Sequence, residues 1–358
     1  MAAHPYQTLA SPHFWNRSVA GRRLADIDYD PAPKFRFQLT EDRFATAGSC
    51  FARHFGRTLV QRGGQLFLAE TRHPLIPKTA GHGYGIFSAR YGNLYNTRQL
   101  RELVDQALGK VPPICEFARR ADGRWIDMLR PRAVPDGFTS EEEARVDRLY
   151  HLRRVRHLLQ SCSVFVFTLG LTEMWRNKRA GYSYGICPGV IAGAFAAAEH
   201  EFKNLSFREC VADLAAVFEA IYTLNPRIKV LLTVSPVMLV ATAEARGVLQ
   251  SSTASKAILR AVADECVRYV AFVDYFPSYE IITGPQATGR FFDHNLREVR
   301  EEGVQLVMDM FFKSRILGSG QPARPAMPIA TATDFHSNTA EIVEAIQAEC
   351  DEIFLNPQ

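Results

Sequence analysis

Four short apolar runs, separated by segments with helical periodicity, are the feature that most constrains how this chain can fold. They cover residues 43–48, 162–170, 228–236 and 269–276, and a weaker fifth run, 65–70, follows a glycine pair. Each run has the length and near-continuous apolar character of a strand buried on both faces. Strands that alternate with helices form βαβ units, so we expect a mostly parallel, doubly wound sheet.

The segments between these runs carry the end signals of helices. Ser140 precedes three glutamates that complement a helix N-terminus, and Pro226 ends another helical pattern. The expected helices cover residues 50–61, 140–160, 206–226, 255–268, 297–312 and 337–354. Helices on both faces of such a sheet make a three-layer α/β/α sandwich, which is the fold we predict.

Two segments interrupt the alternation of strands and helices. Residues 110–148 contain four prolines and few periodic apolar positions, and residues 176–205 open with the irregular stretch RNKRAGYSYGICPG. Both follow elements that should end at the rim of the sheet, where long ordered loops commonly form lids or substrate walls. We predict one domain over residues 1–319 with these two insertions. A proline-rich connector and a C-terminal helix would follow over residues 320–358.

Charge and cysteine content exclude several classes of protein. The net charge is +4, and the densest basic patch, residues 149–160, has the helical spacing of a solvated helix face, so no nucleic-acid partner is expected. Seven cysteines without a C-x-x-C pair form neither a disulfide framework nor a zinc site, and we expect no metal and no cofactor. The N-terminus lacks a signal-peptide pattern, and no apolar run reaches about 20 residues. We predict a cytoplasmic protein that inserts in no membrane.

Polar residues follow the expected strands where a ligand would bind, beyond their carboxyl ends. The first cluster is Gly48-Ser49-Cys50, at the change from strand to helix. A nucleophile there would benefit from the helix N-terminus, which favours a thiolate and can hold an oxyanion. The turn by itself is better explained by packing, with Ser49 as a helix N-cap and Cys50 as a buried first-turn residue. The rest of the chain has to decide between these interpretations.

Six motifs, which occur in a fixed order along the chain, favour a functional interpretation of the turn. GSCFA at residues 48–52 is followed by FSARYGNLYNTRQL, TLGLTEMW, LLTVSPV, SKAILR and YFPSYEII, in that order. Over roughly residues 4–313 the chain resembles the GSCFA family, which is similar to the SGNH/GDSL hydrolases. The resemblance implies a flavodoxin-like three-layer fold and ester hydrolysis or acyl transfer, often on carbohydrates. It also implies a place in polysaccharide biosynthesis.

The resemblance carries roles onto particular residues. The Gly-Asp-Ser block of SGNH hydrolases puts Cys50 at the nucleophile position and Ser49 at the position of the aspartate. Cysteine is a strong nucleophile once a base or a helix dipole supports its thiolate. The second block makes Gly92 a donor of the oxyanion hole. The third block places Thr172 where those enzymes have an asparagine, so either its hydroxyl or Asn93 would complete the hole.

The catalytic base is the weak part of the resemblance. The Asp-x-x-His block of SGNH hydrolases falls on Asn295 and Glu298, so the histidine is missing from its place. His294 with Asp293 beside it is the nearest substitute, although adjacent side chains point the same way only in an irregular loop. Glu298 would serve as a general base if burial raised its pKa.

Five further residues remain as candidates. His54 lies one helical turn after Cys50 but is more simply a packing residue, and His82 lies in the glycine-rich stretch GHGYG. Glu173 and Tyr279 are predicted to bind substrate, because they follow strands and Tyr279 belongs to an aromatic segment suited to stacking on a sugar. Glu173 with Glu280 would also make the carboxylate pair of a glycosidase, a third and distant hypothesis.

These observations favour an SGNH-like acyl-ester hydrolase or acyltransferase that acts on a carbohydrate-type small molecule or glycan. The alternative hypothesis is a non-catalytic binding or scaffold protein on the same frame, which the missing histidine favours. The sequence leaves the acyl group, the acceptor and the oligomeric state open.

Overall fold

The central sheet of the protein contains five parallel strands. A computed structural model describes residues 4–72 and 83–318. The strands are β1 (Arg43–Ala47), β2 (Gln65–Leu66), β5 (Val164–Leu169), β8 (Lys229–Val234) and β9 (Val273–Tyr275). Their spatial order is β2-β1-β5-β8-β9, and every neighbouring pair is parallel. This doubly wound sheet confirms the predicted fold.

Helices cover both faces of the sheet because the strand side chains alternate between two apolar cores. In β5, Phe165 and Phe167 join one core, whereas Val164 and Val166 join the other. The first core includes residues of α3 (Thr97–Ala107), α4 (Glu141–Ser161), α5 (Phe207–Leu224) and α6 (Val248–Tyr269). The second includes residues of α2 (Cys50–Gln61), α7 (Ser278–Thr283) and α8 (Glu301–Arg315). The fold is therefore a three-layer α/β/α sandwich.

The predicted helix ends hold where side chains cap them. Ser206 and Glu209 form a capping box at the start of α5, and Ser140 accepts the Glu143 N–H at the start of α4. The prediction was wrong for α6, which begins before residue 255. Its first buried positions are the serines Ser251 and Ser252 rather than apolar residues, so hydrophobic periodicity did not show them. The strand expected at 269–276 is also shorter, since α6 continues to residue 269 and β9 covers only Val273–Tyr275.

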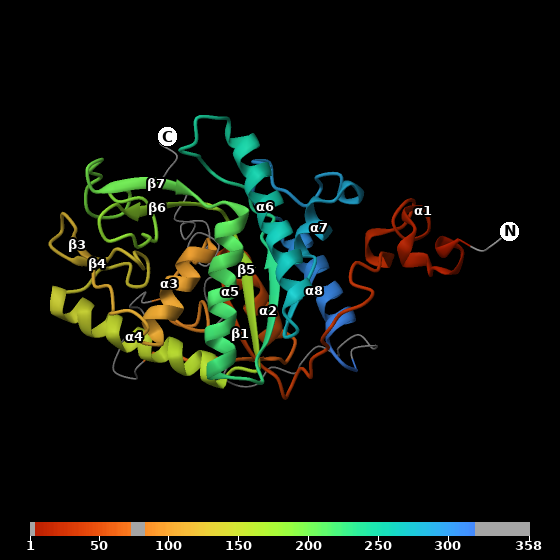
Figure 1. Cartoon of the computed structure of the whole chain (residues 1–358), viewed down its shortest axis with the longest axis horizontal. Helices are drawn as coiled ribbons and strands as arrows, with labels where there is room; N and C mark the ends of the chain where they lie inside the picture. The colour runs from red at the N-terminus through yellow and green to blue at the C-terminus, as the bar shows by residue number, and fades with distance from the viewer. Residues whose placement is uncertain (1–3, 73–82, 319–358) are drawn as a thin grey trace.

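Each predicted insertion contains an antiparallel hairpin. The first is β3 (Phe117–Arg119) with β4 (Trp125–Asp127), and the second is β6 (Glu173–Asn177) with β7 (His200–Asn204). Figure 1 shows both hairpins at the same end of the molecule. The insertions also touch, because the Tyr184 hydroxyl donates to Glu116 at 2.9 Å and the Gly185 N–H donates to the Met128 carbonyl at 3.1 Å. Together they form one rim beside the sheet.

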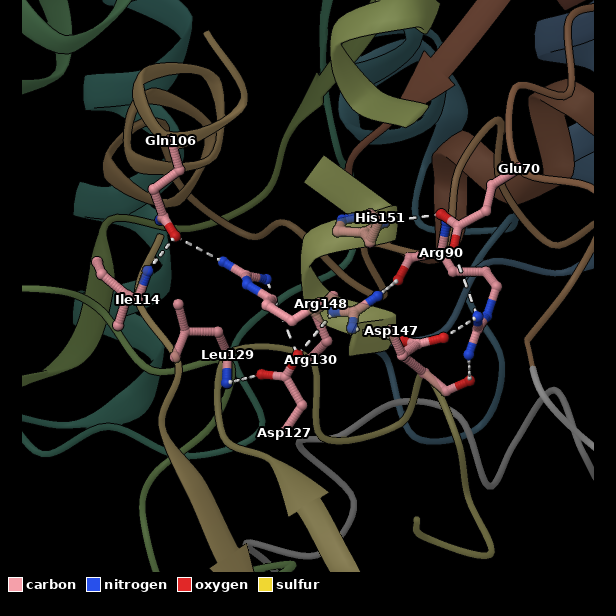
Figure 2. A network of polar contacts seen from close by, with 11 residues as sticks. Glu70, Arg90, Gln106, Ile114, Asp127, Leu129, Arg130, Asp147, Arg148 and His151 are labelled. Carbon is pink, nitrogen blue, oxygen red and sulfur yellow. Dashed lines mark hydrogen bonds and ion pairs between the residues drawn. The ribbon is translucent and has the colours of Figure 1, made fainter. Parts of the chain in front are cut away.

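A buried ionic network ties the first insertion to α4 (Figure 2). The Arg130 guanidinium lies between Asp127 and Asp147, at 2.8 Å from each carboxylate. Asp147 also pairs with Arg90 at 2.8 Å, and Arg90 with Glu70 at 3.3 Å. Because these partners come from the segment after β2, the segment before α3, β4 and α4, the network fixes four parts of the chain relative to one another.

The remaining elements are short turns of helix near the ends of the described chain. They are α1 (Trp15–Ser18) and the 3₁₀ turns Pro5–Thr8, Ser11–His13, Leu24–Asp26 and Pro285–Ala287. His82, the proline-rich connector and the helix expected at 337–354 lie outside the described residues. In residues 4–72 and 83–318, every helix is too short or too polar to cross a bilayer.

Candidate functional site

The turn between β1 and α2 is built around a glycine that no other residue can replace without strain. Gly48 has a φ of +140°, and a Cβ added to it would lie 2.8 Å from both the Cβ and the carbonyl oxygen of Thr168 in β5. The Leu94 N–H donates to the Gly48 carbonyl at 2.8 Å. Three segments therefore meet between the carboxyl ends of β1 and β5, where the strand order reverses and α/β sheets bind their ligands.

We expect Gly48→Ala to lower the free energy of unfolding by about 2 kcal/mol, because the new methyl group meets Thr168 and the φ is unfavourable. Gly63→Ala is the matched control: Gly63 also has a positive φ, +86°, but a Cβ there would meet nothing within 4 Å. The control should cost about 1 kcal/mol. Urea denaturation of both variants measures the difference, and equal losses would contradict the close approach.

Ser49 and Cys50 stand at the N-terminus of α2. Ser49 is the N-cap residue and is 6% exposed, yet its side chain does not cap the helix. In the described part of the chain its hydroxyl forms no hydrogen bond to a histidine or a carboxylate. Cys50 is the first residue of α2, and its side chain lies outside what the structure describes. Ser49 thus occupies the N-cap position that the packing interpretation predicts, although its hydroxyl does not cap the helix.

The predicted oxyanion residues lie on two segments beside this turn. Gly92, with a φ of +68°, and Asn93 immediately precede Leu94, which is bonded to Gly48. Thr172 is fully buried, and its hydroxyl is 3.1 Å from the hydroxyl of Ser255 in α6. Its predicted role would require that hydroxyl to leave Ser255.

Two residues of α6, to which the sequence assigned no role, form hydrogen bonds with the segment that follows β5. The Lys256 ammonium, fully buried, donates to the Gly170 carbonyl at 2.6 Å, and the Thr172 N–H donates to the Ser255 hydroxyl at 3.0 Å. Both residues belong to the motif SKAILR, which was visible in the sequence. Only the packing of α6 against the end of β5 shows what the motif does.

The loop expected to supply the base lies against the segment that follows β8. The Arg297 Nε–H donates to the Met238 carbonyl at 2.9 Å. His294 and Asp293 do approach each other, with 3.0 Å between Nδ1 and Oδ1, in a loop whose Leu296 has a φ of +53°. The His294 side chain is 89% exposed, whereas that of Glu298 is 32% exposed. Of the two candidate bases, Glu298 is the more enclosed.

Other predicted residues have structural partners. Burial, together with the charge of Arg53, lowers the pKa of His54 to about 4, so His54 is neutral at pH 7. Tyr279 packs against the first apolar core. Glu280 pairs with Arg260 of α6 and accepts the hydroxyl of Tyr275 in β9 at 2.7 Å, so α6 and β9 hold its carboxylate.

A cavity of about 210 Å³ lies beside the segment that follows Leu94. Tyr95 and Asn96, which follow Leu94 directly, form one wall, and Glu173 and Trp175 of β6 form another. The Tyr95 carbonyl accepts the N–H groups of Gly170 and Leu171 at 3.0 and 2.7 Å. The structure thus places the predicted substrate residue Glu173 at a cavity that the chain links to the Gly48 turn through Leu94 and Tyr95.

Glu102 holds the segment that forms a third wall of the cavity. Its carboxylate accepts the N–H of Ser183 at 2.8 Å and the Ser183 hydroxyl at 3.0 Å, directly before the wall residues Tyr184 and Gly185. Burial raises the pKa of Glu102 to about 7, with Asp213 adding to the rise and Arg98 opposing it. The protonated form is therefore the one that folding favours.

We expect the stability of the wild type to fall relative to Glu102→Gln as pH rises from about 4.5 to 7. The pKa of Glu102 is higher in the folded chain than in the unfolded chain. Its contribution to the free energy of unfolding is therefore complete below about pH 4.5 and is lost as the pH rises through about 7. The glutamine cannot ionise, and the difference should reach about 2–3 kcal/mol at pH 8. Urea denaturation at several pH values tests this. Parallel curves for the two proteins would contradict it.

Comparison with known proteins adds one finding. The family model described as the GSCFA family matches residues 43–311, which include the turn, both insertions and the loop at 293–298. No curated protein matches the chain.

Proposed function

Because this chain belongs to the GSCFA family, we propose that it is an SGNH-like acyl-ester hydrolase or acyltransferase acting on a carbohydrate-related substrate. The observation that carries the proposal is the position of the Gly48-Ser49-Cys50 turn. It stands at the N-terminus of α2, between the carboxyl ends of β1 and β5. Leu94, whose N–H donates to the Gly48 carbonyl, directly precedes the cavity residue Tyr95. A nucleophile at a helix N-terminus is close to backbone N–H groups that stabilise negative charge.

In the proposed reaction the Cys50 thiolate attacks the carbonyl carbon of an ester. The carbonyl oxygen becomes an oxyanion, which the N–H groups of Cys50 and Gly92 would hold, with Asn93 or Thr172 as a further donor. Collapse of this intermediate expels the alcohol, which takes a proton, and leaves a thioester on Cys50. Water or the hydroxyl of an acceptor then attacks the thioester, so that the same enzyme would hydrolyse or transfer the acyl group.

Two features of the surroundings support this chemistry. The buried Lys256 ammonium lies at the carboxyl end of β5, where it adds positive charge beside the turn. Glu298 or His294 would serve as the base from the loop that contacts Met238. The five cysteines whose side chains the structure describes are free thiols, which fits a reducing compartment and hence our proposal of a cytoplasmic protein. The proposed role in polysaccharide biosynthesis rests on the family resemblance alone.

The test is to trap the acyl intermediate. Purified protein is mixed with p-nitrophenyl acetate, quenched in acid and digested, and the acetylated peptide is identified by mass spectrometry. We expect release of p-nitrophenol with an initial burst and an acetyl group on the peptide that contains residues 49 and 50. Steady turnover with acetylation confined to other peptides would overturn the assignment.

The second candidate function is a non-catalytic binding or scaffold protein. The exposure of His294 and the absence of a histidine or carboxylate bonded to Ser49 in the described residues favour it. Such a protein would release no p-nitrophenol above the buffer rate yet would still bind ligand in the cavity. The same experiment, paired with a binding measurement, separates the two candidates.

A further inference from the structure

The cavity lined by Glu173 and Trp175 contains a single charged side chain among its described lining residues. Glu173 contributes a carboxylate, and among the described residues that line the cavity there is no lysine, arginine or histidine. Arg246 and Glu244 affect Glu173 electrostatically with opposite signs, but neither lines the cavity. A ligand that carries a negative charge would therefore meet a carboxylate and no compensating cation.

Aromatic rings form much of the cavity wall. Trp175 packs edge to face against Phe202, with 5.7 Å between the ring centroids, and Tyr95 and Tyr184 line other parts. Flat rings of this kind offer broad apolar faces to a ligand of matching shape. Pockets for drug-sized ligands span roughly 300–1,000 Å³. A cavity of about 210 Å³ therefore suits a single ring rather than a longer molecule.

Polar groups at two walls require a ligand that makes hydrogen bonds. Glu173 accepts the Thr242 hydroxyl at 2.7 Å through one oxygen, and its half-buried carboxylate can accept more. Asn96 uses its side-chain oxygen to accept the Gln99 N–H at 2.9 Å, while its buried Nδ2 has no partner within the described residues. A purely apolar ligand would leave these groups unsatisfied, which costs free energy.

From these three observations we infer that the cavity is a binding subsite for one uncharged ring that carries hydroxyl groups. Glu173 accepts hydroxyl hydrogens and excludes anions, and the aromatic walls pack on the ring. A hydroxyl oxygen that reaches the wall at Asn96 completes the hydrogen bonding of Nδ2. This inference rests on the proposed function in one respect, because the ring would be the alcohol part of the substrate or the acyl acceptor. The binding itself needs no catalysis.

The test measures binding in a chain that cannot turn over. Isothermal titration of full-length Cys50→Ala compares four probes at pH 6: methyl β-glucoside, glucuronate, glucosamine and 1-hexanol. We expect a millimolar Kd for the neutral glucoside and at least tenfold weaker binding of the anionic glucuronate. Tighter binding of glucosamine than of the glucoside would overturn the inference in favour of an amine site. Equal binding of hexanol would overturn it in favour of an apolar site.

Glu173→Gln gives a readout that a misfolded protein cannot imitate. It should weaken binding of the glucoside about tenfold. It should also strengthen binding of glucuronate relative to the glucoside, because the charge that repels glucuronate is gone. Asn96→Asp keeps the oxygen that caps α3 but removes the Nδ2 donor, and it should weaken the glucoside about tenfold. Glu201→Gln, which alters a partly exposed ion pair on β7, is the control and should change neither ligand.

The outcomes distinguish this inference from the proposed function. Unchanged selectivity in Glu173→Gln, or no glucoside binding, overturns the inference even if the wild type hydrolyses esters. Binding with the expected selectivity supports it even if the wild type shows no turnover, a result that would remove only the proposed hydrolase activity.

Discussion

Replacing Cys50 with alanine is expected to lower kcat/KM for p-nitrophenyl acetate by at least about 10³-fold, because the variant cannot form the thioester. Cys50 stands at the first position of α2, where the helix N-terminus favours a thiolate. Ser49→Ala should cost much less, since in this mechanism Ser49 only shapes the turn. Initial rates over a range of substrate concentrations measure both effects.

Cys187→Ala is the matched control for this prediction. Cys187 lines the cavity, and burial raises the pKa of its thiol, which makes it a poor nucleophile. Its loss should leave kcat/KM within about twofold of the wild type. If both Cys50→Ala and Ser49→Ala retained full activity, the nucleophile would lie elsewhere and the proposed mechanism would be wrong.

The largest effect on stability is expected from Arg130→Met, which should lower the free energy of unfolding by about 3–5 kcal/mol. The Arg130 side chain is 1% exposed and pairs with Asp127 and Asp147 (Figure 2). Removing the guanidinium leaves these carboxylates buried with less compensation, and this loss is what destabilises the chain. Denaturant unfolding followed by circular dichroism gives the value.

Two further variants show whether burial is the cause. Arg176→Met breaks an ion pair with Glu201 whose side chains are about one-third exposed, and it should cost about 1 kcal/mol or less. Adding Asp127→Asn to Arg130→Met removes one of the uncompensated charges and should restore part of the loss. A small effect of Arg130→Met, equal to that of Arg176→Met, would contradict the role assigned to the network.

The fold was largely predictable because apolar residues recur along the chain in the patterns of buried strands and helices. The runs that became β1, β5 and β8 are continuous apolar segments, and their alternate residues enter two separate cores as a doubly covered sheet requires. The start of α6 was missed, since Ser251 and Ser252 are buried polar residues. Their hydroxyls serve contacts with residues 239–246 that no periodicity records.

The candidate site was predictable only in part. The motif at 48–50 placed a turn at the carboxyl end of β1, and the structure agrees. The close approach of Thr168 to Gly48 and the contact between Lys256 and Gly170 each depend on a residue distant in sequence. The sequence also does not show that the Nδ2 of Asn96 lacks a partner within the described residues. For the same reason, the exposure of His294 could not be read from its place beside Asp293.

The sequence by itself determined the layers of this protein, the strand-to-helix turn at Gly48 and its family. Side-chain periodicity and short motifs are local properties, so they can be identified in the amino-acid sequence alone. Only the tertiary structure decided that Asn96, Glu173 and the segment after β8 share one cavity, and that no cation lines the part of it formed by described residues. The lining of the cavity depends on how four segments distant in sequence pack at the rim. Their charged and hydrogen-bonding groups come close to one another only after the sheet brings the segments together.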